Sequence, residues 1–240
     1  MSPPLLETRA VVKHFGGVQA IRGVDFALAE GELRCLIGPN GAGKSTFFKL
    51  LTGQLKPTRG EVLFRGRDIT AMETHEIARL GIGVKTQVPS VFNGLPVREN
   101  LWIAAARCRS RRAAARTVEA QIERLGLGAV ANTAAGQLAH GQRQRVELGV
   151  VLCADPGLIL LDEPAAGMTE DERAETTELI RDINRDHPLI VVEHDMAFIR
   201  RIARRITVFN HGEILLEGGV DEVFASPAVR DVYLGKAVAR

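Results

Sequence analysis

The stretch GPNGAGKST, residues 38–46, constrains the fold of this chain more than any other part of the sequence. It matches the pattern G-x-x-x-x-G-K-[ST] and stands between the apolar run ELRCLI and the helix-like segment KSTFFKLLTG. Glycines allow backbone N–H groups to turn inward around phosphate oxygens, and the following helix adds the positive end of its dipole. Lys44 would reach the terminal phosphates, and Ser45 would ligate Mg²⁺. The stretch therefore predicts a nucleotide site where a strand meets a helix.

Apolar and polar segments alternate along the chain in a way that predicts an α/β fold. Strands are expected within residues 8–15, 23–38, 60–70, 81–86, 157–163, 188–194, 206–210 and 212–218. Helices are expected after the glycine-rich loop, within 74–81, 97–153, 170–186 and 195–205, and twice near the C-terminus. Near-continuous apolar strands between helices favour a parallel sheet covered on both faces. The helical middle is expected to be an insertion between two halves of this core.

Composition is typical of a globular chain. The 240 residues, 45% hydrophobic and 25% charged, suffice for one core with a subdomain. No apolar run approaches the roughly 18 residues of a membrane span, and the N-terminus lacks the apolar core of a signal peptide. A net charge of +2 is too small to argue for nucleic acid or an anionic membrane. Cys35, Cys108 and Cys153 show no CxxC spacing, so buried, reduced thiols are expected.

Two acidic residues, Asp162 and Glu163, end the apolar run LILLDEP. Ligands of open α/β sheets bind at the carboxyl ends of strands, so both acids can reach the phosphate region. Asp162 would hold Mg²⁺, through water or directly, and Glu163 would orient or deprotonate the attacking water. Acids also end strands as caps of the next element, but the phosphate loop favours the catalytic interpretation.

Three further residues carry weaker signals by themselves. His194 ends another apolar strand in LIVVEHD and could hydrogen-bond the γ-phosphate, although a histidine at a strand end is more often structural. Gln87 follows the strand GIGVKT and carries almost no signal alone. Phe15, in KHFGG, could stack on adenine or pack a strand, and packing is favoured when it is taken alone.

Taken in order, these residues resemble the motifs of the ATP-binding cassette (ABC) family, over essentially the full chain. The matching pieces are GPNGAGKST, Gln87, LAHGQ at 138–142, LILLDEP, and His194 in VEHDM. The resemblance implies an ATPase that uses ATP and Mg²⁺. It also implies one domain over 1–240: a P-loop NTPase (RecA-like) core with a mainly parallel sheet, an N-terminal antiparallel β subdomain, and a helical subdomain inserted at about 88–155.

The resemblance also assigns a role to each matching residue. The catalytic residues would be Glu163, His194 and Gln87. The magnesium contacts would be Ser45, Gln87 and Asp162. The contacts to ATP would be Phe15, Gly38, Pro39, Asn40, Gly41, Ala42, Gly43, Lys44, Ser45, Thr46, Leu138, Ala139, His140, Gly141 and Gln142.

The signature LAHGQ departs from the family's usual Leu-Ser-Gly-Gly-Gln, which contacts the γ-phosphate held by a partner subunit. Ala139 replaces the serine, and the lost hydrogen bond to a charged group is worth about 1.5–3 kcal/mol. Gly141, Gln142 and the helix start still offer amides and a dipole, so a weakened contact is expected. His140 could add a donor or simply face solvent. Thr169 stands at the family's aspartate position in a later loop, which puts cross-dimer communication through that residue in doubt.

A single cassette implies pairing with a second ABC ATPase subunit, either an identical or a sister chain. The pieces VEHDM, DEPAAGM and SPAVRDVYLGKA resemble the ATPases of branched-chain amino-acid and urea/amide importers, and His140 with Met168 favours the urea branch. This implies polytopic permease subunits, an extracytoplasmic solute-binding protein as an indirect partner, and a peripheral place on the cytoplasmic face of the inner (plasma) membrane. Residues 87–106 are expected to line the groove for the permease.

Two other functions stay open: a lipid-exporter ATPase, and a soluble ABC ATPase acting on nucleic acid or ribosomes. The second rests on a cluster of arginines that could contact phosphates: Arg107, Arg109, Arg111, Arg112 and Arg116. No aromatic residue is interleaved with them, and alanine- and arginine-rich helices are usually solvated. Transport is therefore favoured, and no nucleic-acid partner is expected.

Overall fold

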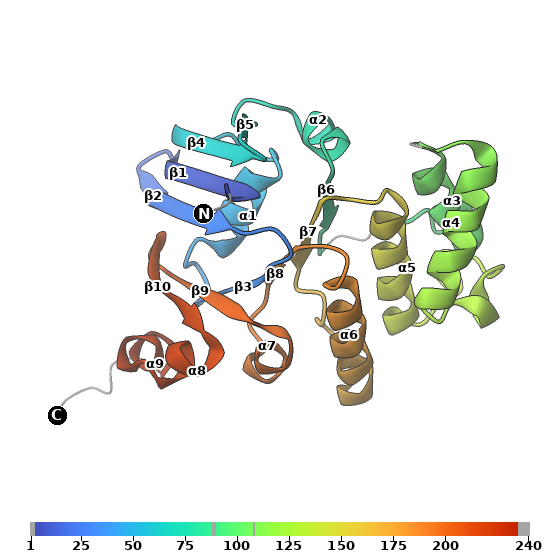
Figure 1. The fold of residues 1–240 in the computed structure, drawn as a ribbon. Helices are drawn as coiled ribbons and strands as arrows, with labels where there is room; N and C mark the ends of the chain where they lie inside the picture. Colours follow the sequence, from blue (N-terminus) through green and yellow to red (C-terminus); the bar gives the residue numbers. More distant parts are fainter. Residues whose placement is uncertain (1–2, 88–89, 108, 235–240) are drawn as a thin grey trace.

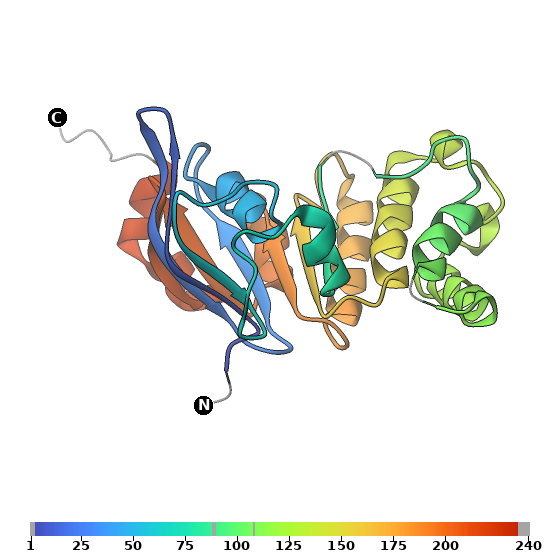
Figure 2. The ribbon, with the colours of Figure 1, turned by 90° about the horizontal axis from the view of Figure 1, so that it is seen from above.

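Two β-sheets pack together: the smaller one forms an outer layer of the molecule, and most of the helices lie on the other side of the larger one (Figures 1 and 2). The computed structural model describes residues 3–87, 90–107 and 109–234. The segments predicted as strands and helices from the sequence all contain the expected element, so the α/β prediction is confirmed.

The larger sheet carries the site. Its order is β10-β9-β3-β8-β7-β6, in which β10 is antiparallel to β9 and the other neighbours are parallel. The strands are β3 (Leu33–Ile37), β6 (Ile82–Lys85), β7 (Leu158–Asp162), β8 (Leu189–Val192), β9 (Arg205–Asn210) and β10 (Glu213–Gly219). Strands β3, β7 and β8 therefore end at the same edge. Asp162 is the last residue of β7, and the phosphate loop, Glu163 and His194 follow β3, β7 and β8, respectively.

The smaller sheet is antiparallel, in the order β2-β1-β4-β5, and packs on one face of the larger sheet (Figure 1). Its strands are β1 (Leu6–Phe15), β2 (Val18–Leu28), β4 (Arg59–Phe64) and β5 (Arg67–Asp68).

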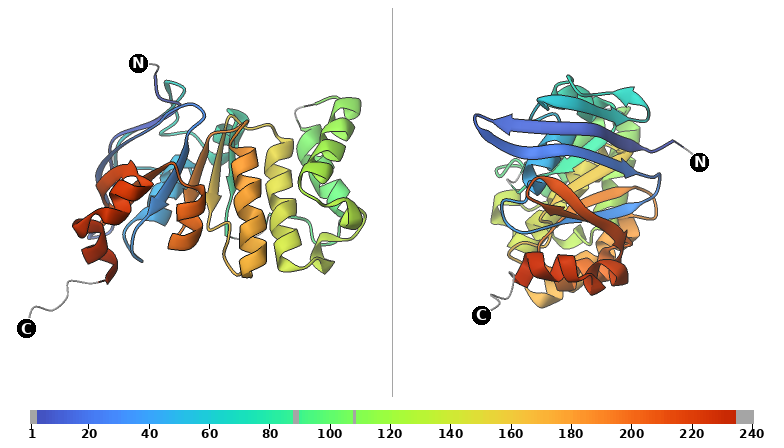
Figure 3. Two further views of the ribbon diagram at one scale, coloured as in Figure 1. Left: turned by 60° about the horizontal axis from the view of Figure 1, so that its bottom comes forward. Right: turned by 90° about the vertical axis from the view of Figure 1, so that its left-hand side faces the viewer.

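Two apolar clusters cover the two faces of the larger sheet. Alternate residues of one strand point to opposite sides, so Cys35 joins one cluster and Leu36 the other. One cluster includes α1 (Lys44–Leu51), α2 (Thr74–Arg79) and the smaller sheet. The other includes α3 (Val97–Ala106), α4 (Arg111–Arg124), α5 (His140–Cys153), α6 (Glu170–Ile183), α7 (Met196–Ile202), α8 (Val220–Ala225) and α9 (Pro227–Leu234). Figures 1 and 3 both place α5 between α6 and the pair α3–α4.

Several boundaries differ from the prediction. The helical stretch 97–153 is three α-helices joined by turns and two short 3₁₀ segments, Gly128–Val130 and Ala135–Gln137. The helix expected to reach 186 ends at Ile183, and the one expected over 195–205 spans Met196–Ile202 because the chain joins β9 at Arg205.

Cys35 and Cys153 are buried free thiols, as expected, and Cys108 lies outside the described residues. Burial raises the pKa of Cys35, and raises that of Cys153 to about 12. Among the described helices, none has the length and apolar character that crossing a bilayer requires.

Candidate nucleotide site

The phosphate loop follows β3 and turns sharply into α1. Gly38 has φ 149°, and a Cβ at that position would stand 2.3 Å from the Phe209 carbonyl oxygen. Gly43 has φ 107° immediately before α1, and a Cβ there would stand 2.9 Å from the Ala20 carbonyl oxygen. Both positions therefore require glycine for space as well as for backbone conformation. The loop brings the start of α1 to the edge where β3, β7 and β8 end.

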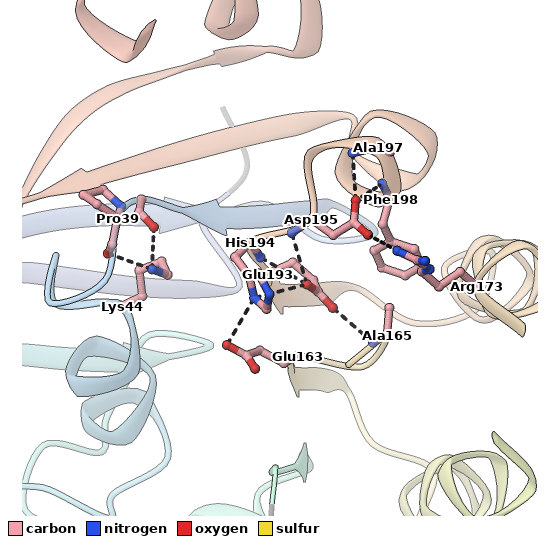
Figure 4. Close-up of polar contacts among 11 residues, drawn as sticks. Pro39, Lys44, Glu163, Ala165, Arg173, Glu193, His194, Asp195, Ala197 and Phe198 are labelled. Carbon is pink, nitrogen blue, oxygen red and sulfur yellow. Dashed lines mark hydrogen bonds and ion pairs between the residues drawn. The ribbon is translucent and has the colours of Figure 1, made fainter. Parts of the chain in front are cut away.

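Lys44 is the cation of this site. Its Nζ donates to the carbonyl oxygens of Gly38 (2.6 Å) and Pro39 (3.0 Å), so the ammonium lies inside the loop (Figure 4). Burial lowers the pKa of Lys44, and the nearby carboxylates of Glu163 and Asp162 oppose that shift. The fold therefore brings the two acids at the end of β7 to the lysine of the phosphate loop.

Asp162 offers an uncommitted oxygen. Its Oδ1 is buried and has no hydrogen-bond partner within the part of the chain that the structure describes. Burial raises the pKa of Asp162, the neighbouring Glu163 raises it further, and Lys85 opposes both. A buried carboxylate oxygen without a donor fits a hard divalent cation.

Glu163 and His194 face each other across the ends of β7 and β8. His194 Nδ1 lies 3.4 Å from Glu163 Oε1 (Figure 4). The His194 side chain is 61% exposed and that of Glu163 28%, so both can meet a ligand. Glu163 has φ 48°, a left-handed conformation that costs a non-glycine residue about 1–3 kcal/mol. Such strain at the residue predicted to be the base is typical of functional sites.

Phe15 and Gln87 both have exposed side chains. Phe15 ends β1 with 46% of its surface exposed, and Lys13 Nζ lies 5.2 Å from its ring centroid. This ring therefore lies outside the apolar core, and its stacking on adenine stays a prediction. Gln87 is exposed, two residues beyond β6.

The signature residues form the start of α5. Ala139 is the N-cap, and its N–H donates to Gln142 Oε1 at 3.2 Å. The His140 ring is exposed but not free, because Nε2 lies 3.0 Å from the carbonyl oxygen of Ala166. A Cβ on Gly141 would stand 2.4 Å from Glu172 Oε1, so a larger residue there would require the Glu172 side chain on α6 to move.

Thr169 has a structural task that the resemblance did not suggest. It is the N-cap of α6: its Oγ1 accepts from the Glu172 N–H, and its own N–H donates to Glu172 Oε2 at 2.9 Å. These reciprocal bonds form a capping box, and the letters TEDE were a visible signal for it.

The sequence does not reveal several buried charged side chains, among them Glu193, Lys85 and Glu147. Glu193 is 1% exposed and accepts from the N–H groups of Ala165 and His194, both at 3.0 Å. Lys85 Nζ pairs with Glu147 Oε2 at 3.6 Å, and each side chain is 2% exposed. In the sequence, these residues are marked only as charges within or beside apolar runs, and such a pattern does not identify the partner of each charge.

The signature does not reach the phosphate loop of its own chain. Figures 1 and 2 both place α5 away from α1, with strands of the larger sheet between them. The start of α5 instead contacts α6 and the loop before it, through Gly141 and His140.

Comparison with known proteins gives a consistent result. Residues 21–166 match the family described as ABC transporter. The high-affinity branched-chain amino acid transport ATP-binding protein LivG of Salmonella typhimurium is 36% identical, over 99% of this chain and 100% of LivG. The lipopolysaccharide export system ATP-binding protein LptB of Acidithiobacillus ferridurans is also 36% identical, over 96% and 97%. Among solved structures, the ADP conformation of an ATP-binding cassette of an ABC transporter superimposes with a TM-score of 0.87, at 29% identity, over 98% of this chain and 100% of that one.

Proposed function

This chain belongs to the ABC transporter family and is an ATP-binding ATPase, and we propose that it powers an importer for branched-chain amino acids or for urea and short-chain amides. The similarity to LivG over both full lengths supports the branched-chain amino acid cargo. Residues 1–240 would form one ATPase domain, with α3 to α5 as the inserted helical subdomain. One apolar cluster includes residues of β3, of β7 and of these helices, which supports a single domain.

Hydrolysis would proceed by attack of water on the γ-phosphate. Glu163 would orient the water and take its proton, since a carboxylate at the end of β7 faces the phosphate loop. Lys44 and the loop amides would hold the phosphates, and His194 would hydrogen-bond the γ-phosphate. Ser45, Gln87 and Asp162 would hold Mg²⁺, which would supply the Lewis acidity that neutralises phosphate charge.

Pairing of two subunits would complete each site. The signature lies apart from the phosphate loop of its own chain, so its free amides and helix dipole are available to a nucleotide on another subunit. A head-to-tail pair closed by ATP would use both surfaces. The partner would be a second copy or a sister ATPase.

Substituting Ala139→Ser tests this pairing. A serine would restore the hydroxyl that the signature lacks, and we expect ATP-driven dimerisation of the Glu163→Gln variant to tighten by about tenfold or more, because a hydrogen bond to a charged group is worth about 1.5–3 kcal/mol. Analytical ultracentrifugation with Mg·ATP measures the dimerisation constant. Ala115→Ser, on the exposed face of α4, is the matched control. An unchanged constant would show that the missing hydroxyl has no part in pairing.

A groove of about 410 Å³ is the proposed site for a permease helix. It is lined by α2, β6 and the ends of α3 and α5, with the exposed Ala78 and Ala154 on its walls. The sequence predicts that residues 87–106 line the permease groove, and of this segment Ala104 is among the described residues that line the cavity. The cytoplasmic face of the inner membrane is the location that such docking would give.

Affinity purification of the Glu163→Gln variant with ATP and mild detergent tests the function. We expect polytopic subunits, a sister cassette and, for the cargo, a solute-binding protein. Ala78→Trp should abolish recovery of the membrane subunits by filling the groove, whereas Ala115→Trp on α4 should not. Recovery of an exporter's subunits, or of ribosomes or nucleic acid, would overturn the importer and leave the ATPase intact.

The structure weakens the nucleic-acid alternative in one respect. Arg109, at the centre of the arginine cluster, donates to the Cys153 carbonyl oxygen at 2.8 Å and pairs with Asp155 at 3.0 Å. It therefore joins α3–α4 to the end of α5 instead of facing a phosphate.

A further inference from the structure

The segment 164–168 connects Glu163 to α6 and is held at two successive residues. The N–H of Ala165 donates to Glu193 Oε1 at 3.0 Å. The carbonyl oxygen of Ala166 lies 3.0 Å from His140 Nε2 at the start of α5. One contact comes from the inside of the molecule and the other from its surface. The segment that follows the proposed base is therefore fixed by one contact from the interior and one from the surface.

Glu193 makes the inner contact, and its carboxylate serves two loops at once. Oε1 binds the Ala165 N–H, while Oε2 accepts the N–H of His194 at 3.0 Å and lies 3.5 Å from that of Asp195 (Figure 4). The side chain is 1% exposed, so water cannot readily replace it as the acceptor for these donors. Glu193 thus joins the loop after Glu163 to the loop that carries His194.

The backbone at Glu163 needs such support. Its φ of 48° is unfavourable for a residue with a Cβ, and it persists only where the surroundings fix the chain on each side. On the N-terminal side of Glu163, its own N–H donates to the Val192 carbonyl oxygen at 2.9 Å. After it, Ala165 is fixed by Glu193. Val192, the last residue of β8, and Glu193, which follows it, therefore fix the backbone on both sides of Glu163.

We propose that Glu193 is a positioning residue for hydrolysis, whose carboxylate holds Ala165 and His194 together and thereby keeps Glu163 and His194 at the 3.4 Å separation seen between their side chains. The inference rests on the proposed roles of Glu163 and His194. Glu193 itself does not touch the substrate. An amide cannot replace it, because its NH₂ group would face one of the two N–H donors.

Glu193→Gln tests this inference with the full-length chain. We expect kcat to fall by about 10- to 100-fold, since displacement of a reacting group by about 1 Å has effects of that size. The Kd for ADP, measured by titration calorimetry, should stay within about twofold, because Lys44 and the phosphate loop keep their contacts. Glu217→Gln is the matched control, as it changes a carboxylate of the same sheet that binds Arg34 and Thr207 away from the site, and its kcat should not change.

Two further measurements separate positioning from a merely structural role. Glu193→Asp keeps the charge but is one methylene too short to reach both loops, so it should also lower kcat, and it carries the test if the glutamine variant does not fold. In the Glu163→Gln background, adding Glu193→Gln should cost much less than it does alone, because Glu193 acts partly through Glu163.

An unchanged kcat in folded Glu193→Gln, or losses that multiply fully in the double variant, would overturn the inference and leave the ATPase function standing. Substantial hydrolysis by Glu163→Gln itself would instead show that Glu163 is not the base, and the positioning role of Glu193 would then lose its premise. Neither result involves the permease, so the importer is tested separately.

Discussion

Replacing Glu163 with glutamine should lower ATP turnover by about 10²–10⁴-fold, the range that general base catalysis supplies, without loss of ATP binding. The amide has the size of the carboxylate but cannot take a proton from water. It also removes the negative partner 3.4 Å from His194 Nδ1. Lys44 keeps its two bonds to the phosphate loop, so the nucleotide contacts remain.

Release of phosphate measures the turnover, and calorimetric titration with Mg·ATP measures binding. Glu170→Gln, an exposed carboxylate at the start of α6, is the matched control and should turn over ATP at the wild-type rate. Substantial residual hydrolysis in Glu163→Gln would mean that another group is the base. A loss of ATP affinity in parallel with turnover would place Glu163 in nucleotide binding instead.

The part of the site that one continuous segment supplies could be predicted from the sequence. The phosphate loop is nine consecutive residues between a strand and a helix, so its glycines, Lys44 and Ser45 could be read without knowing the fold. Asp162 and Glu163 needed one more step, the rule that parallel strands end at the same edge. The opposing effect of Glu163 and Asp162 on the pKa of Lys44 agrees with that placement.

The groups that hold the site together could not be predicted in this way. Glu193 meets Ala165 across 28 residues, and His140 meets Ala166 across 26. Such contacts depend on how α5, β7 and β8 pack, and a buried glutamate beside a histidine gives no sign of its partner. The sequence likewise left His140 with two possible roles, and neither described the carbonyl that its ring contacts.

The buried pair Lys85–Glu147 is the other contact with a large expected effect. It joins the end of β6, which leads to Gln87, to the middle of the signature helix α5. Burial lowers the pKa of Lys85 and raises that of Glu147, and in each case the charge of the partner opposes the shift. Glu147 Oε1 has no hydrogen-bond partner among the described residues, and Arg143 Nε lies 4.0 Å from it.

Lys85→Met should destabilise the folded chain by about 3–5 kcal/mol, because it removes the buried ammonium that pairs with Glu147 and leaves this carboxylate buried with only the more distant Arg143 Nε, 4.0 Å from Oε1. A chain of this length loses roughly 2–4 °C in Tm for each kcal/mol, so thermal denaturation should show a decrease of about 6–20 °C. The exposed Arg145–Glu175 pair, also made by α5, provides the control: Arg145→Met should change stability by less than about 1 kcal/mol.

The double variant Lys85→Met/Glu147→Leu should recover most of this stability, since apolar residues of similar size replace a buried ion pair at little or no cost. A double variant that is as unstable as the single one would mean that the two charges do not act as a pair. If the double variant regains stability but not ATP turnover, the pair contributes more than stability. It would then also set how α5, and with it the signature, lies relative to the strand that leads to Gln87.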